Sequence, residues 1–271
     1  MTDRIREAIE AANAQGRIAL LPFVTAGHPS PETTPDIVRA IVDAGADVVE
    51  LGVPFSDPLA EGPTIQKSSF DALSRGVTPA ACIDMATRIR ESGVTVPLIF
   101  MGYYNPILSM GIGEFCRRSA AAGVDGLIVP DLPASEAGPL MDEADAAGLS
   151  VIPLLALTST DRSVEQSCRR AGGFIYCVSV LGVTGARAQV SSRVRGLVEK
   201  VRSHTDLPVA VGFGISTPEH VAEVAGYADG AAVGSALVNA ISDGPPETAA
   251  ERAGKYVASL KPGTRAAKVA N

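Results

Sequence analysis

Three carboxylates lie close together in one short segment of this chain. Glu50 ends an apolar run rich in β-branched residues, and Asp57 and Glu61 follow in a loop punctuated by proline and glycine. A glutamate buried at the end of a strand costs free energy unless its charge is paired, solvated or used. Apolar neighbours would also raise the pKa of Glu50, which suits a general acid or base. If Glu50 and Glu61 face one cavity, the chain can perform acid–base chemistry on a neutral carbon skeleton.

Each carboxylate also has a purely structural interpretation. Glu50 could point into water from the end of its strand or pair with a loop lysine. Asp57 and Glu61 stand beside prolines and a glycine, where acidic residues often serve only as turn residues. We expect Glu50 to be the general acid/base, Glu61 to be its partner across the loop, and Asp57 to be structural or interfacial.

A second group of residues predicts anion binding. Glycines and small hydroxyl residues recur within positions 212–218 and 233–236, at the ends of two expected strands, and Ser235 stands where a short helix would begin. Backbone N–H groups at such positions often hold phosphate, although the same residues could form only tight turns and a helix cap. A long stretch of small residues, 180–188, reads either as a connection or as a lid over bound ligand. Tyr103 and Tyr176, near strand ends, are wall residues or polar contacts.

The fold that must position these groups is indicated by a recurring unit. An Ala-rich segment, a glycine and a short β-branched run repeat at Gly45, Gly93, Gly123, Gly148 and Gly172. Each glycine suits a left-handed residue after a helix, and each run suits a strand buried on both faces. With residues 18–24, 207–213 and 231–233, eight strands alternate with helices. This predicts an α/β fold, a closed (β/α)8 TIM barrel, as a single domain over residues 1–271.

Helical periodicity and glycine spacing refine this prediction. Ile5, Ala8, Ile9 and Ala12 recur at the spacing of one helix face. The rival fold, an open doubly wound sheet, would have a GxGxxG turn before its first helix, which is missing here. The intervals between the marker glycines are longest after the second and sixth strands, so we expect extended loops there. In barrels such loops build the active site.

Composition excludes several classes of function. A net charge of −7 argues against binding to nucleic acid or to an anionic membrane, and 46 % hydrophobic residues are ample for a large core. The four cysteines are scattered and the three histidines lie far apart, so neither a disulfide framework nor a metal site is expected. No apolar run resembles a signal sequence or a membrane span, and we expect a cytoplasmic protein.

The segment 50–60, with residues 182–185, 212–216 and 234–235, resembles the α subunit of tryptophan synthase over nearly the full chain. The resemblance implies a barrel lyase that splits indole-3-glycerol phosphate into indole and glyceraldehyde 3-phosphate. It implies that Glu50 and Glu61 are catalytic. It further implies a set of substrate-binding residues: Phe23, Tyr176, Thr184, Gly185, Gly214, Gly234 and Ser235.

The resemblance also implies a partner. The β subunit would complete an α2β2 complex and would alone carry pyridoxal phosphate, so this chain is expected to hold no cofactor. Pro54 and Asp57 would then lie at the interface. One departure stands out, because the family pattern has aspartate where this chain has Glu61, whose arm is one methylene longer.

Two other functions fit the same residues. One is a different phosphate-handling barrel, such as a sugar-phosphate isomerase or an aldolase. A Schiff-base aldolase would need a lysine at a strand end, and no predicted strand contains one. The other is a catalytically weak subunit that mainly activates its partner, which the change at Glu61 makes conceivable.

Overall fold

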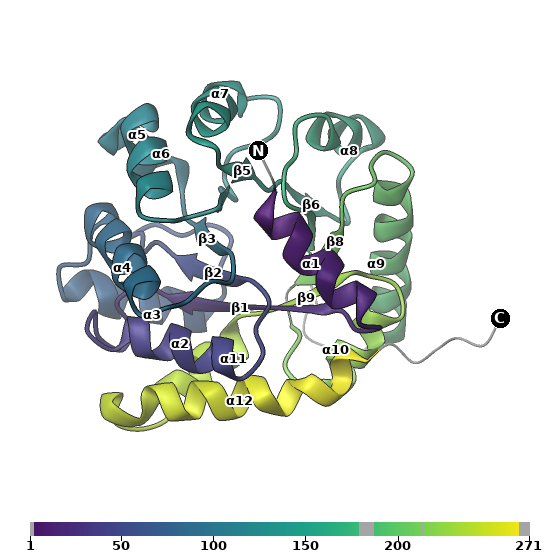
Figure 1. The fold of residues 1–271 in the computed structure, drawn as a ribbon. Coiled ribbons are helices and arrows are strands. Elements are labelled where there is room, and N and C mark those ends of the chain that lie inside the picture. The colour runs from purple at the N-terminus through teal and green to yellow at the C-terminus, as the bar shows by residue number, and fades with distance from the viewer. Residues whose placement is uncertain (1–2, 179–186, 213, 266–271) are drawn as a thin grey trace.

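In a computed structural model, the chain forms a parallel sheet curled into a barrel and ringed by helices (Figure 1). The structure describes residues 3–178, 187–212 and 214–265, without the side chains of 187–191. The strands within these ranges are β1 (Ala19–Thr25), β2 (Val49–Gly52), β3 (Leu98–Met101), β4 (Gly126–Ile128), β5 (Ser150–Val151), β6 (Leu154–Ala156), β7 (Ile175–Val178), β8 (Val209–Gly212) and β9 (Gly230–Val233).

Helices stand in every connection between these strands except the one from β5 to β6. They are α1 (Arg4–Ala14), α2 (Thr34–Asp43), α3 (Pro63–Ser74), α4 (Pro79–Glu91), α5 (Tyr104–Met110), α6 (Ile112–Ala121), α7 (Gly138–Ala147), α8 (Asp161–Cys168), α9 (Arg187–Arg202), α10 (Pro218–Ala225), α11 (Ser235–Ser242) and α12 (Ala249–Thr264), with a 3-10 turn at Pro246–Thr248. Within the described residues, no helix is both long and apolar enough to cross a membrane.

The order of the strands confirms the predicted barrel. Neighbours run β5-β4-β3-β2-β1-β9-β8-β7-β6, every pair of them parallel, so β1 pairs with the last strand and the sheet curls round on itself. The register aligns Phe23 with Glu50, and Glu50 with Ile99. Side chains at the carboxyl ends of different strands are thereby brought to one end of the barrel.

The region of the fifth predicted strand departs from expectation, because β5 is followed after Pro153 by a further strand, β6, that was not predicted. Pro153 stands between the two strands and has no backbone N–H to donate. β5 pairs with β4, and β6 pairs with β7. The predicted sixth, seventh and eighth strands are therefore β7, β8 and β9.

Four of the five marker glycines have the expected left-handed backbone. Gly45, Gly93, Gly123 and Gly148 all have positive φ. At the fifth unit the prediction was one residue off, since Gly173, and not Gly172, has the positive φ of 71°. The expected period of the first helix is confirmed, because Ile5, Ile9 and Ala12 are buried in α1.

The first of the two extended connections contains an additional helix. Between β2 and β3 the chain forms a loop, residues 53–62, and then two helices, α3 and α4. The connection after β7 includes residues 179–186, so the predicted lid, with Thr184 and Gly185, lies outside the described residues.

Aspartates secure the end of the barrel opposite the carboxyl ends of the strands. Each stands just before a strand, accepts a hydrogen bond from a backbone N–H of a neighbouring strand, and pairs with an arginine. The three sets are Asp47 with Leu20 and Arg17, Asp125 with Leu98 and Arg90, and Asp229 with Val209 and Arg202. These contacts serve the fold and leave the other end free for chemistry.

Candidate active site

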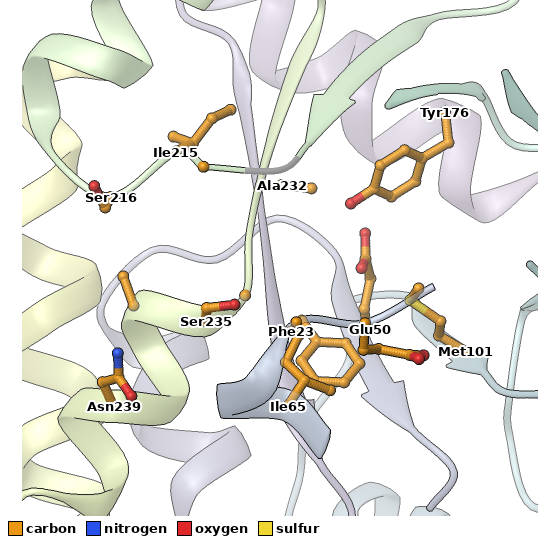
Figure 2. Close-up of a pocket in the computed structure, with 15 residues that line it drawn as sticks. Phe23, Glu50, Ile65, Met101, Tyr176, Ile215, Ser216, Ala232, Ser235 and Asn239 are labelled. Atoms are coloured by element: carbon orange, nitrogen blue, oxygen red, sulfur yellow. The ribbon is translucent and has the colours of Figure 1, made fainter. Parts of the chain in front are cut away.

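A cavity of about 370 Å³ opens at the carboxyl ends of the strands. It brings together most of the residues predicted from the sequence, although they come from distant parts of the chain: Phe23, Glu50, Glu61, Tyr176, Gly214, Gly234 and Ser235. Figure 2 shows Glu50 and Tyr176 on one side of this cavity, with Ser216, Ser235 and Asn239 on the other. One side therefore offers a carboxylate and a phenol, and the other offers small polar groups.

Glu50 is the most deeply buried charged group of the site. It lies on β2 with 1 % of its surface exposed, and its Oε1 has no hydrogen-bond partner among the described residues. Burial raises the pKa of Glu50 to about 8. A carboxyl group with such a pKa is substantially protonated near neutral pH, so it can donate a proton and later take one back. The interpretation of Glu50 as a solvent-exposed glutamate at the end of the barrel is wrong.

Two aromatic rings line the cavity, and each fits there because a glycine lies next to it. A Cβ at Gly52 would lie 2.4 Å from the ring of Phe23, and a Cβ at Gly212 would lie 2.2 Å from the hydroxyl of Tyr176. No side chain other than hydrogen fits at either position. The hydroxyl of Tyr176 points toward the carboxylate of Glu50 (Figure 2), and the charge of Glu50 adds to burial in raising the pKa of Tyr176.

Glu61 lies at the mouth of the cavity and is held by Tyr103. The hydroxyl of Tyr103 donates a hydrogen bond to Glu61 and accepts two, each of 2.8 Å, from the backbone N–H groups of Leu59 and Ala60. Burial raises the pKa of Glu61, and the bond from Tyr103 opposes that shift. The two open interpretations of Tyr103 are thereby decided: it is a polar contact, and it anchors the loop that carries Glu61.

The opposite side of the cavity is built by the start of α11. Gly234 is the N-cap residue and makes no side-chain capping bond, whereas threonines cap α4, α8 and α10. The first intrahelical bond runs from the N–H of Val238 to the carbonyl of Gly234. The N–H groups of residues 235–237 therefore lack helical acceptors, and the helix dipole adds partial positive charge there. Such a helix start suits a phosphate group.

Several lining residues were not predicted from the sequence. They are Gly62, Ile65, Met101, Ile215, Ser216, Ala232, Ala236 and Asn239. Asn239 could have been found from its spacing, because it follows Ser235 by one helical turn. Met101 could have been found as the last residue of a strand. The apolar residues carry no chemical signal that separates them from the core.

Other predicted residues lie apart from the cavity or outside the described part. Asp57 does not line the cavity and accepts a 2.5 Å bond from the hydroxyl of Ser56, as expected of a structural residue. In the parts of the chain that the structure describes, no three His, Cys, Asp or Glu side chains cluster as metal ligands would.

A parallel α/β barrel with a buried carboxylate facing a helix start across one cavity is typical of barrel enzymes that act on small phosphorylated substrates. The chain belongs to the tryptophan synthase alpha chain family, whose model matches residues 9–267. This family cleaves indole-3-glycerol phosphate to indole and glyceraldehyde 3-phosphate, so the chain is a lyase of tryptophan biosynthesis.

Known proteins of this family resemble the chain over almost its whole length. The tryptophan synthase alpha chain of Chloroflexus aurantiacus is 46 % identical over 95 % of this chain and 97 % of its own. The solved alpha subunit from Legionella pneumophila matches with a TM-score of 0.89 and 34 % identity, covering 97 % of this chain and 99 % of that one. A tryptophan synthase structure from M. tuberculosis in an open form matches with a TM-score of 0.87 and 32 % identity, covering 98 % and 100 %.

Proposed function

We propose that Glu50 carries out the proton transfers by which this chain cleaves indole-3-glycerol phosphate. The observation that carries this proposal is a fully buried carboxyl group with a pKa raised to about 8, inside the cavity. In its protonated form Glu50 delivers a proton to C3 of the indole ring, which makes the ring an electron sink. The same carboxylate then removes the proton of the glycerol hydroxyl next to the scissile bond. The C–C bond breaks, its electrons return to the ring, and the hydroxyl carbon becomes the aldehyde.

Glu61 has an electrostatic role in this proposal. Positive charge develops on the indole nitrogen once C3 is protonated, and a carboxylate beside the ring N–H stabilises that charge. The anchoring of Glu61 by Tyr103 supports this role, because a pre-positioned charge needs no rearrangement during the reaction. Phe23 and Tyr176 would enclose the ring.

The phosphate group would bind at the opposite side of the cavity. Gly214, Gly234 and Ser235 would offer it backbone N–H groups at the uncapped start of α11. Thr184 and Gly185, which lie outside the described residues, are proposed to complete this site only on the basis of the resemblance. The binding residues would thus hold the two ends of the substrate. The scissile bond, between these ends, would lie toward Glu50.

We further propose a complex with a β chain that alone carries pyridoxal phosphate, as α2β2 and in the cytoplasm. The loop 53–62 supports an interface, because Leu59 is 84 % exposed in it and Leu108 on α5 is 49 % exposed. Apolar side chains exposed in this way are covered when partners bind. All four cysteines are free thiols, as expected in a reducing compartment.

Steady-state formation of indole from indole-3-glycerol phosphate, with and without an added β chain, tests the proposed function. We expect Glu50→Gln to lower kcat at least about 100-fold while glycerol 3-phosphate still binds, since general acid–base catalysis contributes that much. Glu136→Gln makes the same chemical change at an exposed glutamate after β4 and should leave kcat unchanged.

The two conditions separate the remaining alternatives. A catalytically weak, activating subunit would show negligible cleavage with the β chain present while still raising that chain's activity. Near-normal turnover by Glu50→Gln would remove Glu50 from its proposed role. The described strands contain no lysine, which gives no support to a Schiff-base aldolase.

A further inference from the structure

The segment that follows β8 is held from outside the cavity by two side chains that do not line it. Gly214, Ile215 and Ser216 form one wall of the cavity, at the side that would receive phosphate. Behind this wall lie α10 and α12, which pack closely together: a Cβ at Gly263 of α12 would lie only 2.0 Å from the carbonyl oxygen of Pro218 at the start of α10. Two polar side chains of these helices, His220 and Tyr256, reach Ser216.

His220 accepts hydrogen bonds from Ser216. The backbone N–H of Ser216 donates to Nδ1 of His220 at 3.3 Å, and the hydroxyl oxygen of Ser216 lies 3.3 Å from the same nitrogen. Because a backbone N–H can only donate, Nδ1 is the acceptor and the ring proton is on Nε2. The backbone N–H of His220 is itself bonded to the capping hydroxyl of Thr217. The ring is therefore tied to the same turn that it supports.

Tyr256 holds the carbonyl group of Ser216. Its hydroxyl donates a 2.9 Å hydrogen bond to that oxygen. Burial raises the pKa of Tyr256 to about 12, so the hydroxyl keeps its proton and remains a donor across the neutral range. Since Tyr256 does not line the cavity, the carbonyl of Ser216 is directed out of the cavity toward α12.

The direction of this carbonyl matters because the described part of the cavity wall has no cationic side chain that could offset the negative end of a carbonyl dipole turned inward. Among the described residues that line it, none is lysine, arginine or histidine. A phosphate dianion there would depend on neutral N–H and hydroxyl donors. A carbonyl oxygen turned inward would repel it in a site of low dielectric constant.

We propose that His220 and Tyr256 are positioning residues for the phosphate-binding end of the site, holding Ser216 so that its carbonyl faces away from the bound phosphate. This inference rests on the proposed function. Both residues act on ground-state binding of the phosphate and not on the bond that breaks, which lies toward Glu50. They therefore set affinity for phosphorylated ligands and leave the rate of cleavage at saturation unchanged.

The test compares ligands for the two ends of the cavity, measured by calorimetry on the full chain. Tyr256→Phe removes a single oxygen atom. We expect the Kd of glycerol 3-phosphate to rise roughly 3- to 10-fold, as for loss of one neutral hydrogen bond, and the Kd of indole to stay unchanged. In turnover, KM should rise by a similar factor while kcat is retained. Ser259→Ala removes a helix hydroxyl from the same helix, α12, and should change neither constant.

Substitution of His220 gives an independent arm. His220→Ala should weaken glycerol 3-phosphate binding, and His220→Asn should restore most of it, because the amide oxygen of asparagine can take the place of Nδ1. Equal weakening of indole and glycerol 3-phosphate binding would show a merely structural role and overturn the proposal, as would unchanged phosphate affinity in Tyr256→Phe. If the wild-type chain neither bound glycerol 3-phosphate nor cleaved substrate, the proposed function itself would fail before any variant was compared.

Discussion

At the scale of single residues, burial of Glu50 links its proposed catalytic role to the stability of the fold. The folded pKa is raised from 4.5 to about 8, so between these values the folded chain keeps a proton that the unfolded chain has lost. The stability that comes from burying the neutral carboxyl is thus fully present below pH 4.5 and is lost as pH rises through about 8. The raised pKa of Glu50 therefore makes the folded chain less stable at alkaline pH than at acidic pH.

This linkage gives a pH-dependent prediction. Relative to Glu50→Gln, which cannot ionise, the wild-type chain should lose free energy of unfolding between pH 5 and pH 8, by on the order of 1 kcal/mol per pH unit. Urea unfolding of both proteins at several pH values measures the difference. Stability curves that run parallel for the two proteins would contradict a raised pKa for Glu50.

Glu61 is the residue at which this chain departs from the family pattern that it resembles. Its longer arm is compatible with the site because Tyr103 holds the carboxylate at the mouth of the cavity. We expect Glu61→Asp to keep or raise kcat and Glu61→Gln to lower it, since only the first retains the charge on which the proposed role of Glu61 depends. Indole formation under saturating substrate measures both. A loss of more than about tenfold in Glu61→Asp would mean that the longer arm is required, since misplacement by 1 Å costs about a hundredfold.

At the scale of elements, the glycines that shape the cavity differ in how much room they leave for a side chain. A Cβ at Gly212 would displace Tyr176, whereas a Cβ at Gly234 would meet only Ile65 and Phe23 at 3.5 Å and beyond. The first glycine is needed for the wall of the cavity to form. The fold does not require the second, and our proposal gives it the role of leaving room for a phosphate group at the start of α11.

A pair of substitutions separates these two requirements. Gly234→Ala should fold with a nearly unchanged melting temperature but bind glycerol 3-phosphate at least about tenfold more weakly, because its methyl group occupies the approach to the helix N–H groups. Gly212→Ala should lower the melting temperature as well, because Tyr176 must move. Thermal unfolding and calorimetry distinguish the variants. Unaltered phosphate affinity in Gly234→Ala would count against a phosphate site at α11.

At the scale of the whole molecule, α1 closes the end of the barrel opposite the site. Its Ile5 is fully buried, and a Cβ at Gly126 of β4 would lie 2.7 Å from the tip of its side chain. The backbone N–H of Gly173, before β7, donates to the carboxylate of Asp3, which also caps α1. The first helix thus contacts elements from the middle and the later part of the chain, which supports our proposal that residues 1–271 form one domain.

If the barrel is one cooperative unit, removing the side chain of Ile5 should destabilise all of it. We expect Ile5→Ala to lower the free energy of unfolding by about 2–5 kcal/mol, through lost burial and the cavity left behind. Unfolding followed by far-UV circular dichroism and by tyrosine fluorescence should still give one coincident transition. Glu10→Ala, on the exposed face of α1, serves as the control and should cost about 0.5 kcal/mol or less. Two separate transitions would contradict a single domain.

The amino-acid sequence alone determined the barrel, the alternation of helical and strand segments and the residue types of the site. Buried β-branched runs, marker glycines and helical periods are local signals, because each reflects what one segment must bury or which backbone angles it needs. The same signals placed Ser235 correctly at the start of a helix, but Glu50, expected at the end of its strand, is the second residue of β2. They failed where a local pattern has two solutions, as at Gly172, and they missed the additional strand β6 that follows Pro153.

Only the tertiary structure decided which groups meet. The sequence left the roles of Tyr103 and Glu61 open, and their hydrogen bond joins residues from different connections of the barrel. Glu50, Tyr176 and the start of α11 share one cavity because the curled sheet brings the carboxyl ends of distant strands together. The raised pKa of Glu50 follows from complete burial by those strands. Such distances and burial depend on long-range packing, which no short segment encodes by itself.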